Sequence, residues 1–250
     1  MLELLTSALV TDGLMWIVFA ALLAGLVRGF SGFGTAMIYL PIASQFLTPV
    51  EALVTLTIMD SLGPIPAIPR AVREADWPDL RRLLLSLVFF LPIGLWLLVS
   101  VPPETFRLSV SMVSLLLLAA LILGVRYQGR LSPPKVYGVG GAAGLLGGAV
   151  GLPGPPVILF YMASSHAPNV IRATVMIFLF SFDLILITML GYKGLLSLSG
   201  LALGLILAAP MLIGTMLGTW LFRPSYEKLY RAAAYVIIGV SALRGLPIWG

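Results

Sequence analysis

The sequence predicts an all-α integral membrane protein of two inverted, pseudo-symmetric repeats, each a re-entrant or broken helical hairpin plus three transmembrane helices. Of the 250 residues, 60% are hydrophobic and only 10% are charged, and the mean hydropathy is +1.07. A soluble domain carries about a quarter charged residues, so an ordinary water-soluble globule is excluded. Apolar runs of membrane-crossing length recur along the chain, and two longer runs are interrupted by glycine.

Six apolar runs have the length of simple crossings, about 20 residues for roughly 30 Å of hydrocarbon. They lie near residues 50–69, 83–101, 107–125, 170–190, 198–222 and 232–248. Only short polar joints separate them, so we expect one integrated transmembrane domain without a soluble appendage.

Two further apolar stretches, residues 13–47 and 136–164, are too long for one straight crossing. As continuous helices they would reach about 52 and 44 Å at 1.5 Å per residue. Residues 29–34 (GFSGFG) and 147–156 (GGAVGLPGPP) interrupt them. Glycine and proline break helices, so each stretch is predicted to be broken in its middle.

The two breaks recur at a nearly constant spacing, which indicates a duplication. Gly25, Gly32 and Gly34 match Gly144, Gly151 and Gly154, 119 to 120 residues later. The matches continue downstream, where Gly94 and Trp96 align with Gly218 and Trp220. We therefore expect a first repeat over residues 1–125 and a second over residues 126–250.

Positive charges favour hairpins over single crossings at the two broken stretches. Arg28 lies inside the first apolar stretch and is set aside, which leaves 14 basic residues. With hairpins, eleven of them fall on one side and three on the other; with single crossings the split is nine to five. Cytoplasmic loops carry the excess of Lys and Arg. Hairpins also leave three crossings per half, an odd number, so the halves are inverted and both termini are extracytoplasmic. The alternative has eight crossings and cytoplasmic termini.

A helix break within the membrane is a candidate binding site, because its backbone groups need partners that hydrocarbon does not supply. New helices are expected near Thr35 and near residues 156–157. A helix N-terminus presents free N–H groups and favours an anion. Together with the neighbouring arginine, the residues of the two breaks form the predicted substrate-binding set: Arg28, Ser31, Gly32, Phe33, Gly34, Thr35, Gly151, Leu152, Gly154 and Val157.

Each of these residues also has a purely structural interpretation. The glycines permit tight helix packing in membranes. The Arg28 guanidinium either binds an anionic substrate, reaches toward the interface or pairs with an internal acid. Asp60 and Asp183 lie in the middle of apolar runs at comparable places in the two halves. Such carboxyl groups are candidates for proton coupling, or they form structural pairs.

Other polar residues are expected to have smaller roles. His166 is interpreted as a loop residue, Arg172 as the cytoplasmic end of a helix, and Tyr39 and Tyr161 as packing residues. The sequence has no cysteine and one histidine, which excludes thiolate sites and histidine-rich metal sites. It carries no enzyme motif, and we expect no cofactor, no catalysis and no nucleic-acid partner. The oligomeric state stays open, with a homodimer as one alternative.

The segments GLVRGFSGFG (residues 25–34) and GLLGGAVGLPGPP (residues 144–156), with Pro41 after the first, resemble the TauE/SafE sulfite exporter family. The resemblance implies an inner-membrane permease for sulfur-containing anions such as sulfite or organosulfonates. We therefore expect a secondary transporter that alternates access to a small anion and lies in the lipid bilayer. A passive anion channel and a non-transporting membrane scaffold are the rival interpretations.

Overall fold

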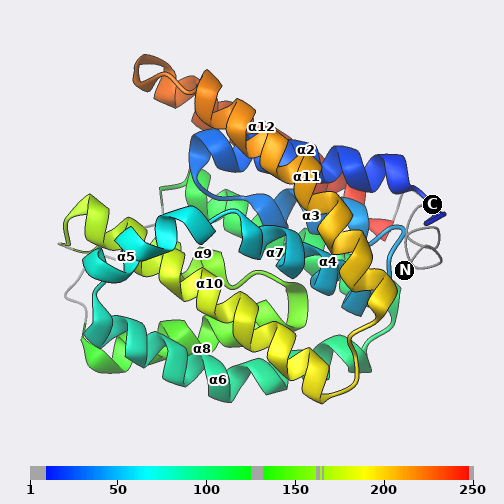
Figure 1. The fold of residues 1–250 in the computed structure, drawn as a ribbon, viewed down its shortest axis with the longest axis horizontal. Coiled ribbons are helices and arrows are strands. Elements are labelled where there is room, and N and C mark those ends of the chain that lie inside the picture. Colours follow the sequence, from blue (N-terminus) through cyan, green and yellow to red (C-terminus); the bar gives the residue numbers. More distant parts are fainter. Residues whose placement is uncertain (1–9, 125–131, 162–163, 165, 248–250) are drawn as a thin grey trace. The chain divides into compact units, whose positions relative to one another are not determined.

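The computed structural model describes residues 10–124, 132–161, 164 and 166–247, and no strand occurs among them (Figure 1). The helices, in chain order, are α2 (Leu14–Ser31), α3 (Thr35–Ala43), α4 (Pro49–Leu62), η1 (Ile65–Ala67), α5 (Ile68–Glu74), α6 (Trp77–Ser100), α7 (Pro103–Ile122), α8 (Pro133–Val150), α9 (Gly154–Tyr161), α10 (Pro168–Tyr192), α11 (Leu198–Leu221), η2 (Pro224–Tyr226) and α12 (Glu227–Gly245). The expected all-α class is confirmed.

The chain divides into two compact units, and each draws on both halves of the sequence. The first unit comprises residues 1–60, 101–119 and 194–250, and the second comprises residues 61–100 and 120–193. Helices that pack together are therefore often distant in sequence. The repeat boundary at residue 125 and the inversion of one half stay predictions.

In the second unit, α6 and α8 pack side by side (Figure 1), and the contact is made at glycines of α8. A Cβ atom added to Gly144 would lie 2.7 Å from the carbonyl oxygen of Leu87, and one on Gly148 would lie 2.7 Å from that of Leu91. Because the residue numbers of both helices increase in the same direction along the contact, the two helices run parallel. The absent side chains let the two backbones touch.

In the first unit, α2 and α11 pack in the same manner. A side chain on Gly25 would overlap the carbonyl oxygen of Met211, and one on Gly29 would overlap that of Thr215. Gly25 and Gly29 precede Gly144 and Gly148 by 119 residues, and their partners follow Leu87 and Leu91 by 124 residues. The two units thus contain helix pairs built on matching positions.

The chain folds back at each helix break, as the hairpin interpretation expects. In the second unit, α8 begins beside the first turns of α6, and Tyr161 at the end of α9 donates a hydrogen bond to Asp79 in the first turn of α6. In the first unit, a side chain on Gly13 before α2 would overlap the ring of Phe46 after α3. Both ends of each hairpin therefore lie together, which a single crossing does not permit.

The breaks are shorter than predicted. Residues 29–31 continue α2, and residues 147–150 continue α8, so only residues 32–34 and 151–153 are non-helical. Helix α3 begins at Thr35 as expected, whereas α9 begins at Gly154, two residues early. Gly29 and Gly148 stay helical because each lies against the backbone of a neighbouring helix, which offsets the low helix propensity of glycine.

The set of membrane spans differs from the expected one at α2, at residues 50–69 and at α12. Helix α2, expected as one arm of a hairpin, is by itself long and apolar enough to cross a membrane. By length and composition, α2, α6, α7, α10 and α11 qualify, and the bent pair formed by α4 and residues 65–74 is a sixth candidate. The predicted run 50–69 is therefore not one straight helix, because Pro64 and Pro66 interrupt it. Helix α12 does not qualify, since Lys228, Arg231 and Arg244 charge both of its ends.

The glycine contacts predict a stability difference between two positions of α8. Gly148→Ala places a methyl group 2.7 Å from the Leu91 carbonyl oxygen and costs about 1–3 kcal/mol through overpacking. Gly138→Ala meets no atom within 4 Å and gains up to about 1 kcal/mol of helix propensity. Thermal unfolding of the purified variants in detergent measures both effects. Equal unfolding temperatures for the two variants would refute the close contact.

Candidate functional site

The first break is a tight turn that only glycine adopts without strain. Gly32 and Gly34 have φ angles of 79° and 98°, in the left-handed region. The Gly32 N–H donates to the carbonyl of Arg28 at 2.8 Å and ends α2. The Ser31 hydroxyl lies 2.7 Å from the Val27 carbonyl oxygen and 2.9 Å from that of Phe33, so it holds the turn.

Helix α3 begins directly after this turn and lacks a side-chain cap. Gly34 is its N-cap residue and has no side chain to accept a hydrogen bond. The first N–H groups of a helix have no intrahelical partner. Gly32 is exposed and Phe33 and Gly34 are half-buried, whereas Thr35 is buried. The first break therefore presents backbone donors at an accessible turn.

Arg28, in the last turn of α2, forms an ion pair with Asp60 of α4. The side chains retain 22% and 20% exposure, so both are largely removed from solvent without being sealed. Of the alternatives for Arg28, pairing with an internal acid is the arrangement observed. The structure therefore brings together one predicted substrate ligand, Arg28, and one predicted proton-coupling residue, Asp60. Arg28 lies four residues before the exposed Gly32.

The second break differs from the first in its donors and in its burial. The Gly151 N–H donates to the Gly147 carbonyl at 3.1 Å, and the Leu152 N–H to that of Leu146 at 3.2 Å. The first turn of α9 contains Pro155 and Pro156, which have no N–H. Residues 151–154 and Val157 are buried. Fewer backbone donors are thus available here than at the first break.

Asp183 lies in the middle of α10 and is buried, with 6% exposure. Its neighbour in sequence, Phe182, occupies the space where a side chain on Gly147 would lie. Gly147 is the residue that matches Arg28 at the 119-residue spacing. The second half therefore keeps the central carboxyl group and lacks the matching arginine.

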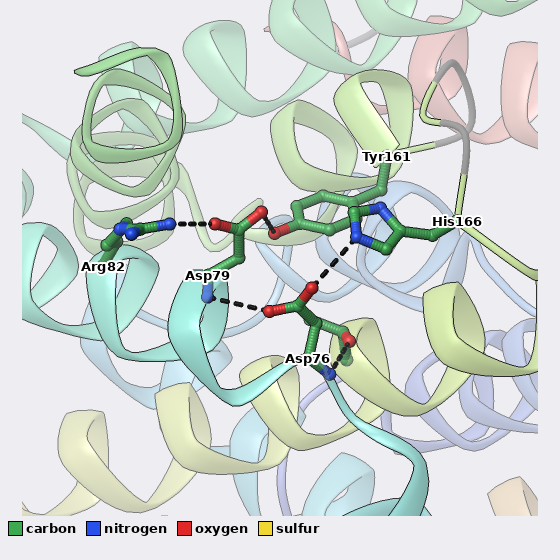
Figure 2. Close-up of polar contacts among 6 residues, drawn as sticks. Asp76, Asp79, Arg82, Tyr161 and His166 are labelled. Atoms are coloured by element: carbon green, nitrogen blue, oxygen red, sulfur yellow. Dashed lines mark hydrogen bonds and ion pairs between the residues drawn. The ribbon is translucent and has the colours of Figure 1, made fainter. Parts of the chain in front are cut away.

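The structure contains a polar cluster that the sequence interpretation missed, which we call the α6 cluster: Asp76, Asp79, Arg82, Tyr161 and His166 (Figure 2). Asp79 accepts from Arg82 Nη1 at 2.6 Å through Oδ1 and from the Tyr161 hydroxyl at 3.1 Å through Oδ2. Asp76 Oδ2 lies 3.0 Å from His166 Nε2. His166 and Tyr161 thus have specific polar partners, beyond the loop and packing roles expected of them.

Asp76 is also the N-cap of α6, since its Oδ1 accepts from the Asp79 N–H at 3.1 Å. Its own N–H donates to Thr174 Oγ1 of α10 at 2.9 Å. An aspartate three residues before another acid, with Trp77 and Pro78 between, is a helix-start signal visible in the sequence. The partners on α9 and α10 follow more than 80 residues later, so no local pattern reveals them.

The Arg28–Asp60 ion pair predicts non-additive effects of two neutralising substitutions. Arg28→Gln and Asp60→Asn each leave one poorly solvated charge without its partner, so each lowers the unfolding temperature. The double variant removes both charges and is less destabilised than the sum, with a coupling of about 0.5–3 kcal/mol. Thermal unfolding of the four proteins in one detergent completes the cycle. Strict additivity would exclude a direct interaction.

Comparison with known proteins assigns the chain to a family. No curated protein and no solved structure matches it. The model of the family described as sulfite exporter TauE/SafE matches residues 17–245, which include both helix breaks, the Arg28–Asp60 pair and the α6 cluster. The match covers nearly the whole chain, and the several apolar helices agree with a multi-pass membrane protein. The chain therefore belongs to the TauE/SafE sulfite exporter family of membrane transporters.

Proposed function

We propose that this protein is a secondary transporter of small sulfur-containing anions, such as sulfite or organosulfonates, and that the anion binds at the first helix break. Family membership supports the transport of sulfur anions. The observation that carries the site is the Arg28–Asp60 pair beside the accessible turn at Gly32. A guanidinium and free N–H groups both favour an oxyanion.

The ion pair links anion binding to proton binding. When Asp60 is ionised, its carboxylate pairs with the guanidinium of Arg28 and competes with an anion for it. A proton on Asp60 removes that competition and frees Arg28 to bind an oxyanion through its planar fork. Because binding linkage is reciprocal, the bound anion also favours protonation of Asp60. One proton and one anion then enter together, and the site keeps the net charge that it has when empty.

Transport in this proposal proceeds by alternating access, and the imposed gradients set its direction. Gly151, Leu152, Gly154 and Val157 of the second break stay within the proposed substrate-binding set, and Asp183 stays a candidate for proton coupling. A passive channel would use the first break without Asp60. A scaffold would not move anions at all.

Proteoliposomes separate the transporter from its rivals. We expect an inward-directed proton gradient to drive sulfite above its equilibrium concentration in vesicles that contain the purified protein. Measurements of internal sulfite with and without the gradient test this expectation, with a proton ionophore as the control. Uptake that never exceeds equilibrium indicates a channel. The absence of uptake, with protein-free vesicles as the reference, indicates a scaffold.

Substitutions at the ion pair test the coupling. Arg28→Gln removes a charged hydrogen-bond donor, so the apparent affinity for sulfite falls at least about tenfold. Asp60→Asn frees Arg28 permanently, so downhill sulfite movement persists while the response to a proton gradient is lost. Arg81→Gln, at an exposed position of α6, is the control arginine and leaves both properties unchanged. If the Asp60→Asn variant still responds to a proton gradient, a residue other than Asp60 couples proton movement to anion transport.

A further inference from the structure

The α6 cluster ties together three helices of the second unit at one end. Asp76 and Asp79 lie at the start of α6, Tyr161 is the last residue of α9, and His166 precedes α10 (Figure 2). The Asp76 N–H adds a hydrogen bond to Thr174 of α10. The returning arm of the second hairpin is therefore attached to α6 at this cluster.

Without a proton on His166, the α6 cluster has a net charge of −1. Asp76 and Asp79 carry two negative charges, and Arg82 supplies one positive charge. The other acid nearby, Glu74 of α5, is balanced by Arg70 at 2.7 Å and also accepts from Asn169 at 3.4 Å. His166 faces Asp76, with 3.0 Å between Nε2 and Oδ2. A protonated His166 neutralises the cluster.

The attachment is reachable from solvent although its core is buried. Asp79 and Tyr161 are 7% and 1% exposed, whereas the side chain of His166 is 30% exposed. The imidazole is therefore partly exposed, although its Nδ1 atom is buried and has no hydrogen-bond partner among the described residues.

The returning helix of the first hairpin is held by a different polar contact. Its tyrosine, Tyr39 of α3, shares a hydrogen bond with the Thr55 hydroxyl at 2.8 Å. Both partners are neutral and fully buried. The second break is buried throughout, whereas Gly32 of the first break is exposed.

We propose that His166 and Asp76 form a proton-binding site that fastens the end of α9 to the start of α6, and that loss of this proton opens the second break. The proposal rests on the proposed function, since only a protein that alternates between conformations needs this break to open. Protonation of His166 makes its hydrogen bond to Asp76 charge-assisted and stronger. Deprotonation leaves a neutral bond and an unbalanced carboxylate, which weakens the attachment.

Cysteine labelling tests the proposal directly, because the chain has no native cysteine. Leu152→Cys places a thiol at the second break, where the native side chain is 0% exposed. Tyr192→Cys, where the native side chain is 94% exposed, gives the reference rate and corrects for thiol ionisation. We expect the relative maleimide labelling of Leu152→Cys in proteoliposomes to be about fivefold slower near pH 5.5 than near pH 8.

Two substitutions remove the proton site by different routes. His166→Gln keeps a donor toward Asp76 and does not titrate. Asp76→Asn keeps the N-cap oxygen for the Asp79 N–H and removes the charge that attracts the proton. In both backgrounds we expect the relative labelling rate of Leu152→Cys to change less than twofold across the same pH range.

The labelling results test the proton site independently of the transport assays. A relative labelling rate that does not change with pH overturns the proposal, and so does a pH response that persists in both variants. A pH response that is lost in His166→Gln and in Asp76→Asn supports it. Because labelling requires no anion, this response without sulfite transport would retain the proton site and reject the proposed function.

Discussion

The structure depends on one constraint: backbone groups freed by a helix break in apolar surroundings must find partners. At the first break, Ser31 and the Gly32 turn satisfy the end of α2 and leave the start of α3 uncapped. At the second break, backbone bonds from residues 151 and 152 satisfy α8, and two prolines remove donors from α9. Close glycine contacts along α2 and α8 then hold the hairpins in place.

The two hairpins share a backbone plan and differ in polar content. Matching glycines pack α2 on α11 and α8 on α6, so the scaffold of each unit is alike. In the first unit, charge lies beside the break, as the Arg28–Asp60 pair. In the second unit, charge lies at the far end of the returning helix, as the α6 cluster. Similar glycine contacts with unequal charges suit a division of roles between the anion binding and the proton-dependent opening that we propose.

An arginine–aspartate pair suits an anion carrier because charge within a membrane is costly. The pair is neutral when empty, and exchange of the carboxylate charge for that of the anion keeps it neutral. A lone arginine would hold the anion tightly and would carry an unbalanced charge once the anion left. The partial exposure of both side chains, near one fifth, leaves access for the exchange.

The sequence by itself determined the helical class, most membrane spans and both helix breaks, because hydropathy, glycine and proline act locally. The count of basic residues favoured a fold-back at each break over a single crossing without deciding between them. It also singled out Arg28 and Asp60, since an ionisable residue in an apolar run is conspicuous without a structure. Only the tertiary structure decided that these two residues pair. It alone revealed that Gly29 and Gly148 stay helical and that Asp79 meets Tyr161, because those outcomes depend on contacts between residues far apart in the chain.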